Sequence, residues 1–530
     1  MGDGKAYRVI YRRIRVLNEN GRIWSDVDAP FMGLEQEVFE INGRTILPNG
    51  TIINMNENNI FKKEAVRSKE VEFDQYSFSI PGVTDDCIIE YQIKYKLEAP
   101  TGMWIIQKEI PLIRGEYFWK FHIFEISPYW ADFYSSFLPM TPNYLWLNCN
   151  LNKNIEYLPS LKEATDMHFT ILDVPAFEKE PFMISEISVK SRLICYYARE
   201  GTPATYWGKE ASYFNKYAMG FCEENKKIKA IIEPIKGLAT DQEKIDSAYK
   251  WVQNNVLNLN YDSPEPKSKK RTIKRIKDNK DVNAIIKRGY ASPLELSILF
   301  WDMLREMDID AKIGFASDRS ENLFVYEAKY WQFDASVVAI PCGDNRYKFY
   351  QPGQKYTIPG MVPWYFEGVK ALVSAGDINF INVPFSEATV NSINLFYTYS
   401  LNDDFDITGT ADIRLNGQPA RDIRMRLFDK DSSEYNQILK DKFDEMLIGS
   451  SIDSFTVENY NDPYSQLKIK CNVKFPEIEN TGDRILLKPF DYFDDSENPF
   501  TSEERKFALL FQYAMEERES AQINIPEGWK

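Results

Sequence analysis

The sequence predicts a β-rich α+β protein built from three consecutive domains. Alternating apolar and polar residues, broken by turn signals, fill the N-terminal part, two capped amphipathic helices lie in the middle, and strand-like alternation returns near the C-terminus. The aromatic content of 31 Tyr, 34 Phe and 11 Trp supports this bias, because aromatic rings suit the pleated surfaces of sheets. A chain of 530 residues is long enough for each domain to bury its own core.

Residues 1–205 are predicted to form a β-sandwich-like N-terminal region, as one β domain or two. Between Tyr7 and Ile194 the alternating runs are interrupted by turn-forming residues, as at Pro81-Gly82 and Pro142-Asn143. Regular spacing of strands and turns is typical of small sheets that pack face to face.

Residues 206–375 are predicted to form a central α+β core that begins with helices. A first helix is expected over Thr240 to Asn255, where Thr240 and Glu243 have the spacing of a capping box. Apolar side chains recur along it at helical intervals, so one face is suited to burial.

A second helix is marked by Ser292-Pro293-Leu294-Glu295, which supplies an N-cap, a proline at the first helical position and a carboxylate three residues after the cap. Apolar residues then recur through Met307, which indicates a central, mostly buried helix. Short strands are expected at Lys312 to Ala316 and Val337 to Ile340. Residues 376–530 are predicted to form a C-terminal β domain with one helical interruption, at Ser433 to Leu447.

Charge and hydropathy exclude two classes of partner. Lys and Arg number 64 against 79 Asp and Glu, so the net charge of -15 argues against nucleic-acid binding. The longest apolar stretch, Leu296 to Trp301, is far shorter than the ~20 residues that cross a bilayer, so no membrane span is expected. Residues Met1 to Val16 read as a half-buried strand and not as a signal peptide, so the protein is cytoplasmic or its export signal lies outside this chain.

Motifs for cofactors and metals are missing from the sequence. No GxxxxGK[ST], GxGxxG, HExxH or GxSxG pattern occurs, and the 6 cysteines are too scattered for a CxxC motif. We therefore predict no cofactor and no metal. An acidic cluster from Asp491 to Glu497 is interpreted as an exposed loop in preference to a calcium site, and a basic run from Lys267 to Lys277 as a solvated face in preference to an anion-binding surface.

The segment Gly289-Tyr290-Ala291-Ser292-Pro293, which leads into the second helix, resembles the transglutaminase-like fold of the papain-like cysteine-protease superfamily. In that fold a Gly-x-Cys precedes the core helix, and a His and an Asp follow on adjacent strands. A thiolate at a helix N-terminus is stabilised by the helix dipole, and a neighbouring imidazole accepts its proton. The resemblance thus implies acyl transfer or peptide hydrolysis in intact members.

The flanking sequences extend this resemblance over nearly the whole chain. Three motifs are similar to an N-terminal domain of unknown function that precedes such cores in Bacteroidetes-type proteins: Arg44 to Gly50, Ile80 to Val83 with Ile88 to Tyr91, and Pro175 to Met183. Asn498-Pro499-Phe500 and Ile525 to Gly528 are similar to the C-terminal β domain of the same family. The resemblance implies an extracytoplasmic location, in the periplasm or cell envelope, and a chain clipped at both ends.

The residues expected to perform chemistry are replaced in this sequence. Matching the family motifs places Ala291 at the nucleophile position, Ala335 at the histidine and Gln351 at the aspartate. The two histidines of the chain are His122 and His168, so no shift of alignment restores a Cys-His pair within the core. Ser292 is better explained as the helix N-cap than as a nucleophile.

The sequence therefore favours a catalytically degenerate protein that serves as a binding or assembly module for an extended peptide, a protein or an envelope polymer such as a polysaccharide. Trp331, Trp364 and Tyr365 are candidate binding residues, although a role in the core is the preferred explanation of the same rings. Two alternatives remain open. One is an active peptidase, acyltransferase or glycan-acting hydrolase with a non-standard site. Asp302 and Glu306 are a carboxylate pair for such a site, although pairs of this kind are common on exposed helix faces. The other alternative is a carbohydrate binder that uses exposed aromatic residues.

Overall fold

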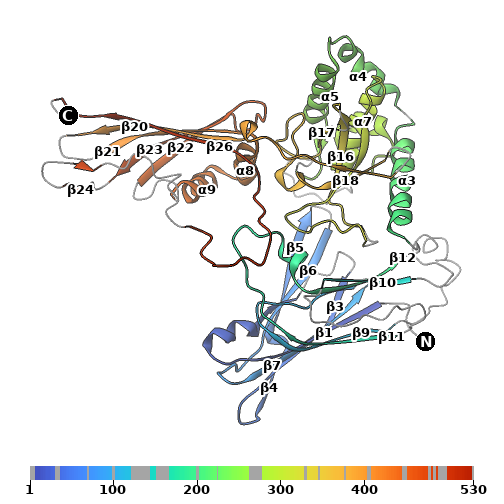
Figure 1. The fold of residues 1–530 in the computed structure, drawn as a ribbon, viewed down its shortest axis with the longest axis vertical. Coiled ribbons are helices and arrows are strands. Elements are labelled where there is room, and N and C mark those ends of the chain that lie inside the picture. Colours follow the sequence, from blue (N-terminus) through green and yellow to red (C-terminus); the bar gives the residue numbers. More distant parts are fainter. Residues whose placement is uncertain are drawn as a thin grey trace. The chain divides into compact units, whose positions relative to one another are not determined.

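The computed structural model describes most of the chain, which divides into two compact units (Figure 1). The described residues are 6–29, 36–68, 71–97, 102–120, 144–150, 166–198, 202–223, 225–261, 277–327, 331–343, 346–374, 378–402, 407–444, 451–475, 479–480, 485–486 and 498–527. The first unit holds the described residues up to Ala176 together with those from Ser191 to Ala198, and the second holds Phe177 to Lys190 and everything described from Thr202 onward. His122, the acidic cluster and the basic run up to Arg275 lie outside the described residues.

The first unit is made mostly of antiparallel strands. One sheet has the order β1 (Ala6–Arg15), β7 (Ile88–Leu97), β3 (Gln36–Ile46), β4 (Ile52–Asn54), and a second has the order β2 (Asp26–Asp28), β6 (Val71–Ser79), β5 (Ile60–Ser68). Phe78 from the second sheet packs with Ile89, Ile93 and Tyr95 from the first in one buried cluster. Five more strands follow: β8 (Gly102–Ile105), β9 (Leu112–Lys120), β10 (Tyr144–Asn150), β11 (Asp166–Val174) and β12 (Arg192–Ala198).

The second unit begins with five helices and an antiparallel sheet. The helices are α3 (Pro203–Phe221), α4 (Lys226–Lys236), α5 (Asp241–Asn255), α6 (Val282–Arg288) and α7 (Pro293–Arg305). The sheet has the order β17 (Tyr347–Tyr350), β16 (Ala335–Pro341), β15 (Lys312–Ala316), β18 (Lys370–Ser374), β19 (Ile378–Asn382). The predicted helix over residues 240–255 and the predicted strand over 312–316 are confirmed, whereas α3, α4 and α6 were not predicted.

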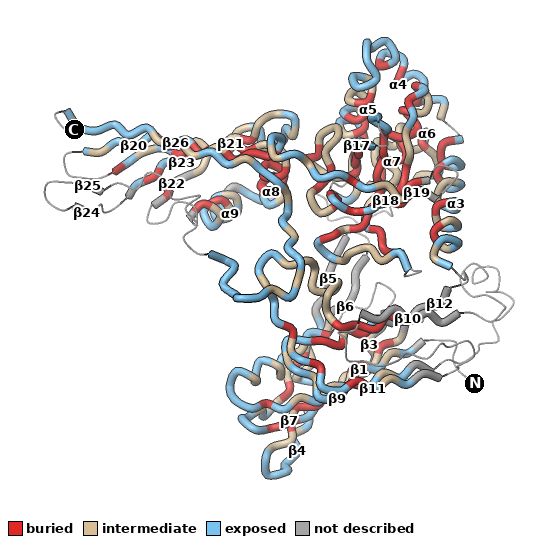
Figure 2. The backbone as a smooth tube through the Cα atoms, in the orientation of Figure 1, coloured by how far each residue is buried: buried red, intermediate tan, exposed pale blue. Residues whose placement is uncertain are grey.

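Helix α7 is the centre of this sheet and helix assembly. Every residue from Leu296 to Leu304 is buried, because the helix packs between α5 and the sheet (Figure 2). Ile313, Val338 and Tyr350 project from the sheet into the cluster around α7, and alternate strand residues such as Val337 project to the opposite face. The predicted capping box is present: the Ser292 backbone N–H donates to Glu295 Oε2 at 2.8 Å, and the Glu295 N–H donates to Ser292 Oγ at 3.3 Å.

The C-terminal part of the second unit is a five-stranded sheet covered on one face by two helices. Its order is β22 (Ser451–Glu458), β23 (Leu467–Phe475), β21 (Ile407–Asn416), β20 (Ser392–Leu401), β26 (Glu516–Asn524), and β26 runs parallel to β20.

Shorter elements of the two units are α2 (Glu186–Val189), β13 (Leu257–Asn258), β14 (Tyr290–Ala291), β24 (Glu479–Asn480), β25 (Ile485–Leu486) and the 3-10 turns at Glu19–Ser25, Glu57–Asn59, Trp364–Phe366 and Ala388–Val390.

One helix of this part corrects the sequence prediction of a single helical interruption. Helix α9 (Ser432–Asp444) agrees with the predicted helix at Ser433 to Leu447 over the described residues, but α8 (Gly417–Leu427) was missed. The buried residues of α8 include Ala420, Ile423 and Leu427 at helical spacing, but buried Gln418, Arg421 and Arg424 interrupt this apolar pattern, so it is weak in the sequence.

A buried polar cluster joins the core sheet to the C-terminal sheet. Gln418, fully buried, donates from Nε2 to the Val362 carbonyl at 2.7 Å and to Glu367 Oε1 at 2.9 Å. Asn391 accepts from the Gln418 backbone N–H at 2.9 Å and donates to the Ala514 carbonyl at 2.9 Å. These four bonds connect the loop between β17 and β18, the segment after β19, the start of α8 and the residues that lead into β26.

Arg319 extends the same cluster toward the C-terminal segment. Its side chain is almost fully buried, and Nη1 donates to the Phe511 carbonyl at 3.1 Å while Nε donates to the Trp364 carbonyl at 3.1 Å. The guanidinium also lies 5.3 Å from the Trp364 ring centre. A buried guanidinium is stable only when its donors are paired, so these contacts fix the position of Phe511.

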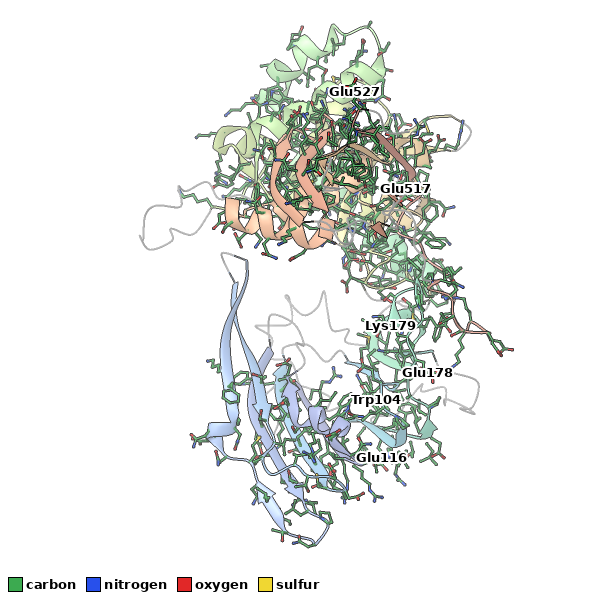
Figure 3. The ribbon with its side chains drawn as sticks, turned by 90° about the vertical axis from the view of Figure 1, so that its left-hand side faces the viewer. Trp104, Glu116, Glu178, Lys179, Glu517 and Glu527 are labelled. Carbon is green, nitrogen blue, oxygen red and sulfur yellow. The ribbon has the colours of Figure 1, made fainter. Side chains whose placement is uncertain are left out.

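The segment Phe177 to Lys190 is held by residues near the C-terminus. The Leu510 N–H donates to the Phe182 carbonyl at 2.7 Å, and the Ile184 N–H donates to the Ala508 carbonyl at 3.3 Å. The exposed Glu178, labelled in Figure 3, pairs with Lys506 at 2.7 Å. The segment between β11 and β12 therefore packs as part of the second unit.

The pair Asp302 and Glu306 differs from the expectation of an exposed carboxylate pair. Asp302 is 1% exposed and pairs with Arg305 at 3.4 Å, whereas Glu306 accepts a hydrogen bond from Asn225 at 2.7 Å. Burial raises the pKa of Asp302 to about 6 and also raises the pKa of the neighbouring Cys222 thiol. The two carboxylates belong to the packing around the end of α7, not to a cleft.

The buried Asp302 predicts a pH-dependent stability. The pKa of Asp302 in the folded protein lies above its ordinary value of 3.8. Between these two pKa values, the folded protein therefore holds a proton on Asp302 that the unfolded chain has lost. The free energy of unfolding therefore falls as the pH rises from about 4 to about 6. Asp302→Asn removes this dependence, which urea denaturation at several pH values measures. The exposed Asp310→Asn serves as the control, and equal pH profiles for wild type and Asp302→Asn would contradict the assignment.

Candidate functional site

A cavity of about 380 Å³ lies at the N-terminal end of α7. It is enclosed by the start of that helix, the start of β16, the residues after β17 and the segment after β13. Its lining residues are Asn260, Ser292, Pro293, Leu294, Phe315, Trp331, Phe333, Asp334, Ala335, Ser336, Gln351, Gly353 and Gln354. A cavity of this size falls within the usual range for ligand pockets.

Close backbone packing brings the two sides of this cavity together. Gly353 lies so near the start of α7 that a Cβ on it would be 2.7 Å from Pro293 Cα. Asn258, which pairs with Ala291 in the parallel β13 and β14 ladder, donates from Nδ2 to the Gly353 carbonyl at 2.8 Å. These contacts hold the residues after β17 against the residues that begin α7.

The three positions matched to the family motifs lie at this cavity or beside it. Ala335 and Gln351 line it, and fully buried Ala291 directly precedes the lining residue Ser292. Gln351 Nε2 donates to the Ser336 carbonyl at 3.3 Å, and Ser336 Oγ bonds Ser297 Oγ of α7 at 2.9 Å. The side chains at the three positions are thus two methyl groups and one carboxamide.

Gln351 has an acceptor that is not satisfied by the described residues. Its side chain is 1% exposed, and Oε1 has no hydrogen-bond partner among them. Leaving a buried carbonyl oxygen unpaired costs about 1–3 kcal/mol. Because Gln351 lines the cavity, a donor brought by a ligand would remove this cost.

The remaining polar residues of the lining have structural partners. Ser292 Oγ serves as the cap acceptor of α7, and no imidazole or amine accompanies it among the described lining residues. Asp334 Oδ2 accepts the Asp318 backbone N–H at 2.7 Å, and burial raises the pKa of Asp334. It is the one carboxylate in the described lining, so the usual carboxylate pair of glycoside hydrolysis is not assembled there.

Three aromatic rings form one wall of the cavity. The Trp331 ring packs 4.8 Å from Phe315 and 5.3 Å from Phe333, measured between ring centres, and its Nε1 donates to the Phe333 carbonyl at 2.8 Å. Trp331 nevertheless remains 43% exposed. An exposed indole fixed by its neighbours provides apolar contact area at low entropic cost.

The other two candidate binding residues lie elsewhere. Trp364 and Tyr365 are in the turn beside the buried polar cluster, where Arg319 packs on Trp364 and Arg421 donates to the Tyr365 hydroxyl at 3.2 Å. Neither lines the cavity. The structure thus brings Trp331 to the site and places Trp364 and Tyr365 at the junction of the core with the C-terminal sheet.

Sequence reasoning missed Phe315, Phe333, Asp334 and the role of Gln351 in the lining. The signal available for Phe333 and Asp334 is their position directly before Ala335. Phe315 lies within the predicted strand, but its apolar character alone indicates a core residue. The unsatisfied acceptor of Gln351 is a property of packing that no sequence pattern reports.

Comparisons with known proteins define one part of the chain. Residues 2–176 match the family model DUF3857, a domain of unknown function with a solved structure. This agrees with the domain of unknown function predicted from the N-terminal motifs. Among curated proteins, none matches the chain.

Two solved structures resemble the chain at low identity. One, described as a "putative protease" from Parabacteroides distasonis, is 11% identical, with 90% of each chain covered and a TM-score of 0.47. The other, a "putative cysteine protease" from Cytophaga hutchinsonii, is 7% identical, with 66% of this chain and 79% of that chain covered and a TM-score of 0.18. No activity is transferred from either likeness.

Among the helices of the described residues, none combines the length and apolar character needed to cross a bilayer. Within the same residues, no group of three or more metal-ligating side chains comes together.

The close approach at Gly353 predicts a specific sensitivity. Gly353→Ala places a Cβ against the backbone of Pro293, so one side of the cavity must move, and we expect a loss of about 1–3 kcal/mol in stability. Thermal unfolding measures this change. Gly220→Ala, in the open on α3, is the matched control and should be neutral or stabilising. An unchanged midpoint for Gly353→Ala would contradict the described packing.

The convergence of the triad positions is tested by restoring two of them. In Ala291→Cys the thiol lies at a buried position, whereas adding Ala335→His supplies a cation that lowers the thiol pKa. We expect alkylation of residue 291 by iodoacetamide near pH 6 to be about tenfold faster in the double variant, as followed by peptide mass spectrometry. The pairing of Ala291→Cys with Thr389→His is the control. Equal alkylation rates in the two double variants would show that positions 291 and 335 do not lie close together.

Proposed function

We propose that the cavity at the start of α7 binds a segment of extended polypeptide and performs no thiol chemistry on it. The observation that carries this proposal is a cavity with an aromatic wall that is also lined by Gln351, whose buried Oε1 has no partner among the described residues. A backbone N–H is the donor that an extended peptide presents at regular intervals, and a peptide side chain would pack on Trp331.

The proposal describes a catalytically degenerate transglutaminase-like protein. It is supported by the sequence resemblance and by the positions of Ala291, Ala335 and Gln351 around one helix N-terminus. The N-terminal end of α7 offers few N–H donors to a developing oxyanion. Pro293 has no N–H, and the N–H groups of Ser292 and Glu295 are used by the capping box. An extracytoplasmic location remains part of the proposal on the resemblance alone.

The test is a selection of peptides by the full chain. A phage-displayed library of random dodecapeptides is panned on the wild type after depletion on Trp331→Ala. Selected peptides are then measured by fluorescence anisotropy against wild type, Trp331→Ala, Trp331→Phe and Gln351→Met. We expect about tenfold or greater weakening for Trp331→Ala and Gln351→Met, and partial retention for Trp331→Phe, because a truncated anchor removes most of its binding energy.

Two controls keep the outcome clear. Tyr217→Ala, on an exposed part of α3, should bind as wild type, and thermal midpoints establish that each variant is folded. Mass spectrometry of the peptide after incubation should show it unchanged. Failure to select any peptide that distinguishes wild type from Trp331→Ala would contradict the binding function, and a cleaved or cross-linked peptide would contradict the absence of chemistry.

A further inference from the structure

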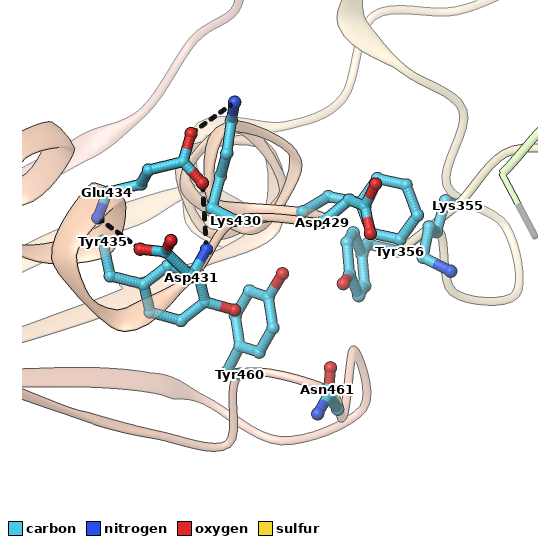
Figure 4. A pocket seen from close by; sticks show the side chains of 10 residues that line it. Lys355, Tyr356, Asp429, Lys430, Asp431, Glu434, Tyr435, Tyr460 and Asn461 are labelled. Carbon is cyan, nitrogen blue, oxygen red and sulfur yellow. Dashed lines mark hydrogen bonds and ion pairs between the residues drawn. The ribbon is translucent and has the colours of Figure 1, made fainter. Parts of the chain in front are cut away.

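A second cavity, of about 720 Å³, lies between the core and the C-terminal part of the second unit (Figure 4). We refer to it as the phenol pocket, and its lining residues are Lys355, Tyr356, Phe428, Asp429, Lys430, Asp431, Glu434, Tyr435, Tyr460 and Asn461. None of them lines the cavity at the start of α7. A ligand of this pocket is therefore independent of the peptide site.

Aromatic rings from three segments surround the phenol pocket. Tyr460 lies 5.4 Å from Tyr435 and 6.0 Å from Tyr356 between ring centres, and Tyr356 lies 6.5 Å from Phe428. Burial raises the pKa of Tyr435 to about 12 and that of Tyr460 above its ordinary value, and the Tyr460 hydroxyl interacts with the hydroxyls of both Tyr356 and Tyr435. Each phenol oxygen can still accept a further hydrogen bond. The pocket thus presents apolar ring faces beside hydroxyl groups.

The wall that carries Tyr460 and Asn461 is held by a buried arginine. Arg424 is 2% exposed, and its Nε lies 3.2 Å from the Tyr460 carbonyl. Its Nη2 lies 2.7 to 3.0 Å from the carbonyl oxygens of Asn459, Asp462 and Ser465. A loop fixed in this way does not need to be ordered when a ligand binds, which favours affinity.

The backbone at the rim is also held in an uncommon conformation. Tyr356 has φ +60° and Asp429 has φ +61°, the left-handed region that non-glycine residues seldom adopt. For a bulky residue such as Tyr356 this conformation costs on the order of 1–3 kcal/mol, and such residues gather at ligand-binding sites. The packed surroundings of Tyr356, which is 8% exposed, maintain it.

The charges of the pocket select against ionic ligands. Lys355 Nζ already lies 4.4 Å from the Phe428 ring centre and 5.6 Å from that of Tyr356, which is the place a cationic ligand would take. The other lining cation, Lys430, is paired with Glu434 at 3.3 Å, so an anion would meet the carboxylates of Asp429 and Asp431. Asp431 and Glu434 also cap α9: the Glu434 N–H donates to Asp431 Oδ1, and the Asp431 N–H to Glu434 Oε2, both at 3.0 Å. A wholly apolar ligand would leave these polar groups without water.

We propose that the phenol pocket binds a neutral oligosaccharide. The C–H faces of a sugar ring pack on the tyrosine rings, and its hydroxyl groups exchange hydrogen bonds with the phenols, the carboxylates and the Asn461 amide. The volume of the pocket suits a ligand of two or three sugar rings.

The test titrates the full chain with chitotriose, cellotriose and maltotriose, using isothermal titration calorimetry and saturation-transfer difference NMR. At least one trisaccharide should bind the wild type. Tyr460→Ala should bind it about tenfold more weakly, and Tyr460→Phe should retain the ring contact but lose part of the affinity. Tyr213→Ala, an exposed tyrosine of α3, is the matched control.

The outcomes separate this proposal from the peptide site. Trp331→Ala should leave trisaccharide binding unchanged, so a failure of either proposal does not carry over to the other. Binding of none of the three trisaccharides, or equal binding by wild type and a folded Tyr460→Ala, would overturn the proposal. So would capture of a random dodecapeptide at the phenol pocket, shown by its loss in Tyr460→Ala, in place of the sugars.

Discussion

The second unit depends on satisfying four buried polar side chains at the place where the core sheet meets the C-terminal sheet. Arg319, Glu367, Gln418 and Asn391 are each nearly or completely buried, and each finds its partners on a different stretch of chain. An unpaired buried polar group costs more than its hydrogen bond contributes, so the arrangement is close to all-or-none. A shift of α8 by a single residue would leave several of these groups without partners. The cluster therefore sets the position of the C-terminal sheet against the core, and with it the opposing walls of the phenol pocket.

The cavity at the start of α7 is shaped by close packing of the backbone and not by buried polar bonds between distant segments. Gly353 permits the backbone after β17 to touch Pro293, and the capping box holds the first turn of the helix. The side chains at and beside this scaffold are alanine at positions 291 and 335 and glutamine at position 351. Backbone packing therefore gives the cavity its shape, and its side chains supply an aromatic wall and one acceptor without a partner among the described residues.

Local signals in the sequence were sufficient for part of the fold. Thr240 with Glu243 and Ser292 with Glu295 predicted two helix starts that the structure confirms, because capping boxes depend on neighbouring residues alone. The strand-rich α+β class is likewise confirmed. Helix α8 escaped prediction because buried polar residues interrupt its apolar face, and these polar residues are satisfied by partners far away in the chain. Asp302 was expected on an exposed face, yet packing beside Cys222 buries it. Trp364 and Tyr365 were binding candidates for which a core role was preferred, and both pack against arginines distant in the chain. Long-range partners decide these positions, and sequence spacing does not report them.

The anchoring of Phe177 to Lys190 by the C-terminal segment has a consequence for biosynthesis. Glu180 accepts from the backbone N–H of Lys506, 326 residues further along the chain. During translation the earlier segment leaves the ribosome long before its partner has been made, so it must wait with Phe177 and Phe182 uncovered. These contacts can close only after Lys506 to Phe511 have emerged. Such a late closure with very distant partners is slow, and it makes the nascent protein a natural client for chaperones that shield apolar segments.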